Sequence, residues 1–253
     1  MTIAVVSSKG GVGKSTMSVL LATLLARVRN DSVTVVDADS DYGSLGRWLA
    51  PDHPVSVNEL AAELEQPGYL VGDLDDHLAL GPEGVRLCPA PRDPRGMAAL
   101  DRERYGRLIV RLQDQPGILI LDCGTGLGQP GVQAAILASD QLVLVSDGES
   151  ATLDQVADAA DLLRHTGAPI TVVINRTRRT SDDARNADTL FPYASALLRL
   201  SNEAPSARLL SSNGFSWDAA PSSWQRETRE VAAVLAAQWI QLNRGESGLP
   251  RAS

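Results

Sequence analysis

The chain has 253 residues, of which 43% are hydrophobic and 21% charged, and its formal net charge is −8. This length allows one large α/β domain with a buried core, and the composition excludes a disordered or collagen-like chain. The acidic balance disfavours a protein that coats nucleic acid, and no apolar run reaches the roughly 20 residues that a membrane span needs. Two cysteines are too few for a disulfide framework and indicate a reducing compartment, so we expect a cytoplasmic protein.

Apolar and amphipathic segments alternate along the chain. The first strand is predicted at 2–7, and the first helix follows a glycine-dense loop at 15–29. The same alternation predicts strands at 33–37, 85–89, 118–123, 141–146 and 170–175, and helices at 101–113, 131–138, 150–166 and 224–243.

The predicted strands are continuous apolar runs, which is typical of strands buried on both faces of a sheet. Their alternation with helices predicts an α/β fold, a doubly wound and mostly parallel sheet with helices on both faces. Neither a linker nor a repeat divides the chain, so we expect one domain over residues 1–243. Residues 244–253 contain Gly, Pro and Ser and are predicted to form a flexible tail.

The loop after the first strand has the composition of a phosphate-binding loop, Ser8-Lys9-Gly10-Gly11-Val12-Gly13-Lys14-Ser15. Its glycines let the backbone turn sharply and point successive N–H groups at a phosphate chain, and the following helix adds its positive N-terminal end. Lys14 is expected to reach the β- and γ-phosphates, and the Ser15 hydroxyl to ligate Mg²⁺. The predicted nucleotide contacts are Gly10, Gly11, Val12, Gly13, Lys14, Ser15 and Thr16. The alternative is a flexible glycine-rich turn, which the flanking strand and helix disfavour.

Acidic residues end two of the predicted strands. Asp37 and Asp39 follow the strand at 33–37, and Asp122 ends an apolar run that begins at residue 117. In open parallel sheets ligands bind at these carboxyl ends. Asp122 is therefore a candidate Mg²⁺ ligand, and Asp39 is a second acid placed where a ligand would bind. Asp39 and Asp41 could instead cap a loop.

The loop resembles the deviant Walker A motif of the MinD/ParA family of ATPases, because Ser8 replaces the usual glycine and Lys9 is an additional lysine. Lys9 and Lys14 are the only lysines among 23 basic residues. The resemblance implies a homodimer with ATP sandwiched at the interface, in which Lys9 reaches the partner's nucleotide. It also implies that Lys9, Lys14 and Asp39 are the catalytic residues, that Asp39 orients the water, and that Asp122 is the Walker B acid. The alternative for Lys9 is a solvated surface lysine.

The nucleotide base and its contacts are predicted from the end of a late strand. Asn175-Arg176-Thr177-Arg178 lacks the acid that a guanine-binding Asn-Lys-x-Asp motif carries, so ATP is favoured over GTP. By resemblance, Asn175 contacts the adenine edge, Arg176 stacks beside it, and Glu149 touches the nucleotide across the dimer interface. Glu149 could also be an ordinary acid at a helix start.

Some residues depart from the family pattern. Ser44 lies where MinD proteins often carry Asn, and Gly124 and Thr125 lie where family members commonly have Pro or Ala. Cys88 and Cys123 lack the Cys-x-x-Cys spacing of iron–sulfur relatives and are expected to be small core residues.

The expected partners follow from charge. The basic cluster of Arg176, Arg178, Arg179 and Arg185 is diluted by aspartates, so DNA binding is expected to be weak or absent. The final helix has apolar residues without a basic stripe, so we expect it to pack on the core and not to bind a membrane directly. A protein partner is favoured. The runs Asp122-Cys-Gly-Thr-Gly-Leu127 and Ala138-Ser-Asp-Gln-Leu-Val-Leu-Val-Ser146 also resemble MinD-like ATPases of actinobacterial secretion loci, type VII loci among them.

The function predicted is a Mg-ATP-binding dimerisation switch that hydrolyses ATP slowly and regulates or positions a protein machine, such as a secretion, pilus or division-like apparatus. Three alternatives stay open: a ParA-type DNA partition ATPase, an ATP-dependent ligase or synthetase of the same fold, and an ATP-binding module that has lost hydrolysis.

Overall fold

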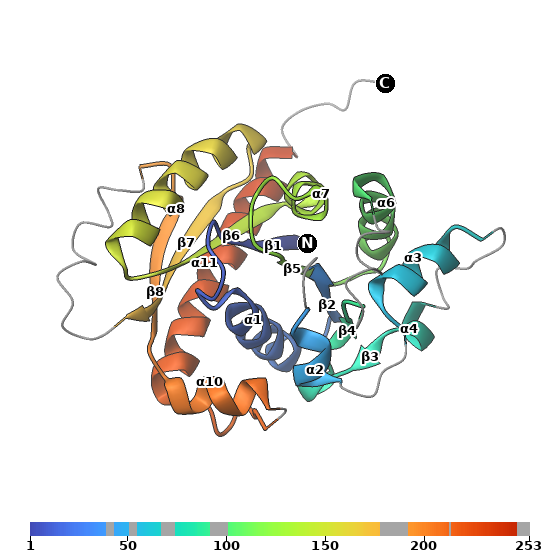
Figure 1. The fold of residues 1–253 in the computed structure, drawn as a ribbon, viewed down its shortest axis with the longest axis horizontal. Helices are drawn as coiled ribbons and strands as arrows, with labels where there is room; N and C mark the ends of the chain where they lie inside the picture. The colour runs from blue at the N-terminus through green and yellow to red at the C-terminus, as the bar shows by residue number, and fades with distance from the viewer. Residues whose placement is uncertain are drawn as a thin grey trace.

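The fold is a single eight-stranded sheet with helices on both faces (Figure 1). A computed structural model describes residues 1–38, 43–50, 55–66, 74–91, 101–177, 192–212 and 214–246. The strand order is β3-β4-β2-β5-β1-β6-β7-β8. All neighbouring strands pair in parallel except β3 and β4. The strands are β1 (Thr2–Val6), β2 (Val33–Ala38), β3 (Ala79–Leu80), β4 (Arg86–Cys88), β5 (Ile118–Cys123), β6 (Gln141–Asp147), β7 (Ile170–Thr177) and β8 (Ala196–Ser201).

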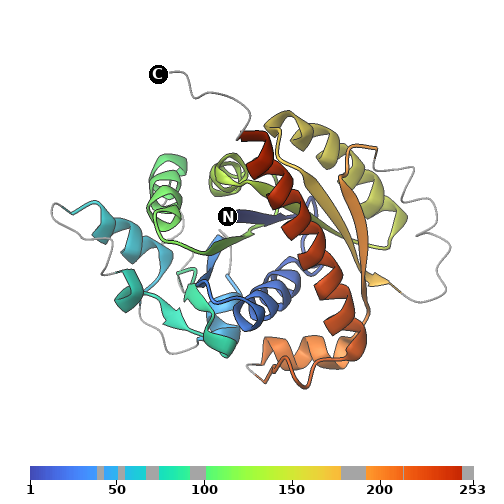
Figure 2. The same cartoon turned by 180° about the vertical axis from the view of Figure 1, so that it is seen from behind.

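The helices form two layers with the sheet between them, and both layers are visible in Figures 1 and 2. One face of the sheet packs in one apolar cluster with α1 (Lys14–Val28), α2 (Leu45–Leu49), α10 (Ala204–Ser211) and α11 (Ser222–Glu246). The other face packs with α3 (Val57–Leu64), α4 (Leu74–His77), α6 (Arg102–Gln113), α7 (Pro130–Ala138) and α8 (Ser150–Leu163). Short 3-10 turns lie at Pro82–Gly84 and Arg164–Thr166. This confirms the predicted doubly wound fold.

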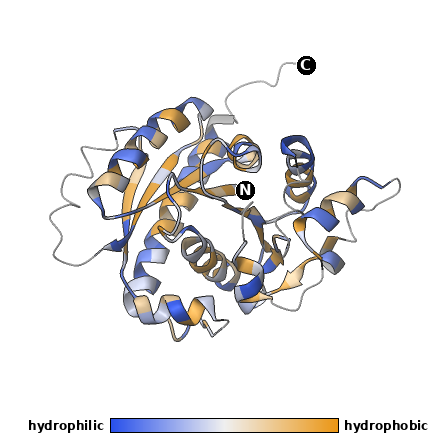
Figure 3. Ribbon diagram, in the orientation of Figure 1, coloured by the Kyte–Doolittle hydropathy of each residue, from blue (hydrophilic) through white to orange (hydrophobic). Residues whose placement is uncertain are grey.

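The apolar runs explain the central strands. Every residue of β1, β2, β5 and β6 is buried, so both faces of these strands need apolar side chains. In Figure 3 the strands are correspondingly the most hydrophobic elements. Because the strands run parallel, the loops that follow β1, β2, β5, β6 and β7 lie at the same edge of the sheet, and this edge carries the candidate site.

Several short elements were not predicted. They are α2, α3, α4, β3, β8 and α10, each of two to eight residues. Of these, α3 has a clear local signal, a capping box in which the Ser56 side chain and Glu59 satisfy each other's backbone N–H groups. The final helix is longer than the predicted 224–243, since it extends from Ser222 to Glu246.

Helix α11 packs on the sheet as the sequence predicts. Val231 and Leu235 are buried in the cluster that α11 shares with α1. A buried polar network adds to this contact, because Gln238 Nε2 donates to Thr171 Oγ1 at 3.1 Å and Gln141 Nε2 donates to Gln238 Oε1 at 3.0 Å. Within the described residues, no helix combines the length and the apolar character needed to cross a bilayer.

Candidate functional site

The glycine-rich loop joins the end of β1 to the start of α1, as predicted. Gly11 and Gly13 have positive φ angles of 76° and 102°, which L side chains rarely adopt. Gly13 is also tightly enclosed, because a Cβ atom there would lie 2.0 Å from Asn175 Nδ2. Gly13 is the N-cap of α1 and has no side chain to cap the helix. The first N–H groups of α1 are therefore available to an anion, and the helix dipole favours one.

Lys14 lies inside this loop with little solvent contact, since only 8% of its surface is exposed. Its Nζ donates to Thr125 Oγ1 at 3.4 Å. No ion pair of Lys14 is formed within the described residues. The Ser8 side-chain oxygen is also buried and finds no hydrogen-bond partner in the described part of the chain. A bound phosphate chain would give this largely buried ammonium an opposite charge, so it fits this cradle.

Hydroxyl and carboxylate oxygens gather beside Lys14. Ser15 Oγ is 3.1 Å from Ser44 Oγ, and one helical turn further on Ser18 Oγ donates to Asp122 Oδ1 at 2.9 Å. Asp122 is paired in register with Asp37 on the neighbouring strand, and both are buried. Oxygen ligands of this kind suit Mg²⁺. The described residues contain no cluster of three or more His, Cys, Asp or Glu side chains that could hold a metal ion.

The loop that carries Ser44 is fixed by Asp37. Asp37 Oδ2 accepts a hydrogen bond from the Leu45 N–H at 2.9 Å. Gly43 packs against the same carboxylate so closely that a Cβ atom would lie 2.6 Å from Asp37 Oδ2. Asp37 therefore acts on the site by holding the segment around Ser44 against the start of α1. Asp39 and Asp41 lie outside the described residues.

Lys9 faces outward on the other side of the loop, with 43% of its side chain exposed. Its Nζ donates to Glu149 Oε2 at 3.1 Å and to Thr152 Oγ1 at 3.2 Å, and lies 3.8 Å from Asp147 Oδ2. The hydrogen bond with Glu149, followed by the charge of Asp147, raises the pKa of Lys9 above its usual value. Lys9 and Glu149, each predicted to touch a nucleotide across a dimer interface, thus contact each other within one subunit.

Glu149 is the N-cap residue of α8, but its side chain makes no capping hydrogen bond. Glu149 is thus an acid at a helix start, as the alternative predicted, and its carboxylate accepts a hydrogen bond from Lys9 Nζ. Asp147 and Thr152 are site residues that the sequence reasoning missed. Asp147 could have been predicted from its position, because it is an acid at the carboxyl end of a strand, as Asp37 and Asp122 are near the ends of β2 and β5.

Asn175 clamps the phosphate loop. It is only 5% exposed, and its Nδ2 donates to the Val12 carbonyl oxygen at 2.8 Å. Its Oδ1 accepts from the Arg176 N–H at 2.7 Å. Arg176 has a positive φ of 58°, a conformation that non-glycine residues adopt mostly at special sites. The adenine contacts of Asn175 and Arg176 stay predictions. Arg178, Arg179 and Arg185 lie outside the described residues.

The two cysteines are buried in the core, as expected. Cys88 and Cys123 each have 1% of their surface exposed, and burial raises the pKa of both thiols well above the usual range. Thiols that stay protonated at neutral pH are poor nucleophiles and poor metal ligands.

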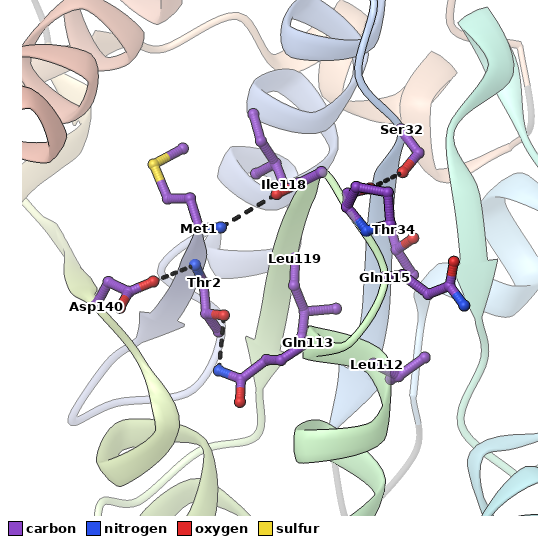
Figure 4. Close-up of a pocket in the computed structure, with 12 residues that line it drawn as sticks. Met1, Thr2, Ser32, Thr34, Leu112, Gln113, Gln115, Ile118, Leu119 and Asp140 are labelled. Atoms are coloured by element: carbon purple, nitrogen blue, oxygen red, sulfur yellow. Dashed lines mark hydrogen bonds between the residues drawn. The ribbon is translucent and has the colours of Figure 1, made fainter. Parts of the chain in front are cut away.

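A separate cavity of about 210 Å³ lies at the opposite, amino-terminal edge of the sheet (Figure 4). Gln113 Nε2 donates to Thr2 Oγ1 at 2.8 Å, and the Thr2 N–H donates to Asp140 Oδ2 at 2.7 Å. These contacts tie α6 and the start of β6 to β1. The cavity lies away from the phosphate loop, which follows the carboxyl end of β1.

Comparisons with known proteins agree with this geometry. Residues 3–190 match the family described as the CobQ/CobB/MinD/ParA nucleotide binding domain. The chain is 29% identical over 185 residues to an uncharacterized ATP-binding protein of Methanocaldococcus jannaschii, covering 72% of this chain and 67% of that protein. It is 27% identical over 165 residues to the ESX-1 secretion-associated protein EspI of Mycobacterium tuberculosis, covering 65% of this chain but only 24% of EspI. The structure of the septum site-determining protein MinD complexed with Mg-ADP, from Pyrococcus horikoshii, has the same fold, with a TM-score of 0.76 at 22% identity over 94% of this chain and 99% of that one.

Proposed function

This chain belongs to the CobQ/CobB/MinD/ParA family of nucleotide-binding proteins, and we propose that it is a Mg-ATP-dependent dimerisation switch that regulates or positions a protein machine. MinD/ParA proteins are ATPases, so the reaction proposed is slow hydrolysis of ATP to ADP and phosphate. The observation that carries the proposal is the position of the two lysines on one loop. Lys14 is buried and has no ion pair within the described residues, whereas Lys9 is exposed beside Glu149.

Different residues of the site would hold the phosphates, the metal ion and the attacking water. The backbone of Gly10 to Gly13 and the Lys14 ammonium would hold the phosphates, with Thr16 in the first turn of α1. Ser15 and Asp122 would hold Mg²⁺, which neutralises charge on the β- and γ-phosphate oxygens when bound. Asp39 would hold the attacking water in line with the γ-phosphorus.

Lys9 is the residue that would couple ATP to dimerisation. In the single subunit its ammonium is bound to Glu149, Thr152 and Asp147. This contact is solvent-exposed and therefore weak, so a polyphosphate presented by a second subunit would compete for the same ammonium. We propose that Lys9 leaves its own subunit's acids and binds the partner's nucleotide when the ATP-bound dimer forms. The dimer surface would then be recognised by a protein partner.

The process served by the switch is proposed from a relative. The likeness to EspI, a secretion-associated protein, favours a secretion apparatus, as the resemblance to MinD-like ATPases of secretion loci also does. The match covers 24% of EspI, so the proposal rests on that matched part of EspI alone.

Sedimentation velocity with and without nucleotide tests the switch. The wild-type protein and Asp39→Ala should dimerise with Mg-ATP and stay monomeric with Mg-ADP. Lys9→Ala should bind ATP with near wild-type affinity but remain monomeric, whereas Lys14→Ala should lose nucleotide binding. Asp39→Ala that stays monomeric with saturating ATP would refute the sandwich dimer.

The alternatives give other results in the same samples. Salt-sensitive binding of the ATP-locked dimer to nonspecific DNA would favour a ParA-type partition ATPase. Phosphate release that requires a small carboxylate or amine would favour a ligase or synthetase. Tight ATP binding without phosphate release, in the presence of any partner, would favour a binding module that has lost hydrolysis.

A further inference from the structure

Thr125 is a polar side chain placed directly over the phosphate loop, three residues after the metal-binding candidate Asp122. Its hydroxyl is within hydrogen-bond distance of the Lys14 ammonium. We propose that the Thr125 hydroxyl is a specificity-determining group that distinguishes a nucleoside triphosphate from a diphosphate by donating a hydrogen bond to the terminal phosphate. This inference rests on the proposed nucleotide-binding function.

Two contacts place the Thr125 side chain. Its Oγ1 accepts from Lys14 Nζ at 3.4 Å. A Cβ atom built on Gly10 would lie 3.4 Å from Thr125 Oγ1 and 3.9 Å from its Cγ2. The side chain therefore rests on the early part of the loop and on its buried lysine at once. A Cβ atom at position 10 would be in ordinary van der Waals contact with it.

The direction of the hydrogen bond between Lys14 and Thr125 determines which further hydrogen bond the Thr125 hydroxyl can make. A lysine ammonium has three donors and no acceptor, so the hydroxyl oxygen must accept from it. The hydroxyl proton is then left to point away from the ammonium. Within the described part of the chain this proton has no acceptor, and a phosphate oxygen bound to the same ammonium would supply one. Neither alanine nor proline at this position would offer a donor.

The location of Thr125 favours the terminal phosphate over the others. The inner phosphates are held by backbone N–H groups where the loop enters α1, at Gly13 and beyond, and the lysine extends to the β- and γ-phosphates. Thr125 lies on the segment after β5 and faces Gly10, where an added Cβ atom would lie 3.4 Å from its Oγ1, at the opposite end of the loop from Gly13. A diphosphate occupies the inner positions in the same way as a triphosphate, so only the terminal group would meet the Thr125 hydroxyl.

The test is calorimetric titration of the full chain with Mg-ADP and with a non-hydrolysable Mg-ATP analogue. Thr125→Val keeps the shape of the side chain and removes the hydroxyl. We expect it to weaken binding of the triphosphate by about 10- to 100-fold, the range of a hydrogen bond to a charged group. Its affinity for Mg-ADP should stay within about twofold of wild type. Thr125→Ser should keep the wild-type preference, because it restores the donor.

Thr166→Val is the matched control, since Thr166 lies in the 3-10 turn before β7, at the amino-terminal edge of the sheet. It should change neither affinity. Unchanged preference for the triphosphate in Thr125→Val would overturn the proposal. Equal weakening of both nucleotides would also overturn it, because Thr125 would then only shape the loop. If Thr125→Val does not fold, the comparison of Thr125→Ala with Thr125→Ser decides. Failure of the wild-type chain to bind either nucleotide would instead refute the proposed function.

Discussion

The contact between Gly13 and Asn175 allows a quantitative test of how the phosphate loop is held. Gly11 and Gly13 both have positive φ angles, but only Gly13 has a neighbour: a Cβ atom there would meet Asn175 Nδ2 at 2.0 Å, whereas one at Gly11 would meet nothing within 4 Å. Substitution by alanine therefore imposes backbone strain at both positions and a steric clash at only one. Gly11→Ala is thus the matched control for Gly13→Ala.

The expected magnitudes follow from these two terms. A side chain in the left-handed region costs about 1–2 kcal/mol, which is the whole expected effect of Gly11→Ala on the free energy of unfolding. Gly13→Ala adds the overpacking against Asn175, about 1–3 kcal/mol, so its total loss should be about 2–5 kcal/mol. Asn175→Ala alone should cost about 1–3 kcal/mol, because the buried Val12 carbonyl loses its donor.

Equilibrium unfolding in urea without nucleotide measures these differences, and a double-mutant cycle isolates the clash. In the combination of Gly13→Ala with Asn175→Ala the clash is absent, so the double variant should be about 1–3 kcal/mol more stable than the two single losses added together. The cycle of Gly11→Ala with Asn175→Ala should show no such coupling. Equal losses for the two glycine variants, or additive behaviour at Gly13, would refute the clamp.

Three further predictions concern groups with shifted pKa values. Glu149→Gln should lower the pKa of Lys9 towards its usual value of 10.5. A ¹³C titration can follow this change because the chain has only two lysines. In the wild-type protein, the contribution of the Lys9–Glu149 pair to stability is lost as the pH rises through the raised pKa of Lys9. Cys88 and Cys123 should be unreactive towards a disulfide reagent at neutral pH until the protein is unfolded, because burial raises the pKa of both thiols. Hydrogen bonds from two arginines of α6 lower the pKa of Glu65, so Glu65→Gln should reduce the melting temperature at pH 7. The difference in melting temperature between the wild type and this variant should shrink as the pH falls below about 4.5, because Glu65 then becomes protonated.

The sequence was sufficient for the long elements because their apolar patterns come from burial on both faces. The strands β1, β2, β5 and β6 are buried throughout and mostly apolar, and they were predicted to within one residue at either end. Short elements lack such a pattern. The two residues of β3 are a strand only because β4 lies beside them, and α2 depends on Gly46, which packs against Pro89 so closely that a Cβ atom would lie 2.8 Å from it. Tertiary contacts of this kind produce no periodic hydrophobic pattern in the sequence.

The same distinction applies to the site. The phosphate loop could be predicted because the residues that make it are consecutive and each has a local physical role. The partners of those residues could not, because they come from distant segments: Lys9 meets Glu149 across 140 positions, and Asn175 meets Val12 across 163. The family resemblance indicated that these residues belong to one site, but it assigned them to the nucleotide. The structure shows the contacts that they make with the protein itself.

The environments of the two lysines explain why an arginine-rich chain has lysine at these two positions. Lys9 Nζ has acceptors on three side chains, Glu149, Thr152 and Asp147, within 3.8 Å. A compact ammonium with three rotatable donors can face three acceptors and can turn to a new one, whereas a planar guanidinium favours a bidentate pair with one carboxylate. Lys14 is buried and, within the described residues, donates a hydrogen bond to a hydroxyl, and the larger guanidinium would bring five donors into the same enclosed space. Replacing Lys9 by arginine should therefore keep the positive charge but impair the exchange of partners, so Lys9→Arg is expected to bind ATP and to dimerise less than wild type in the sedimentation assay.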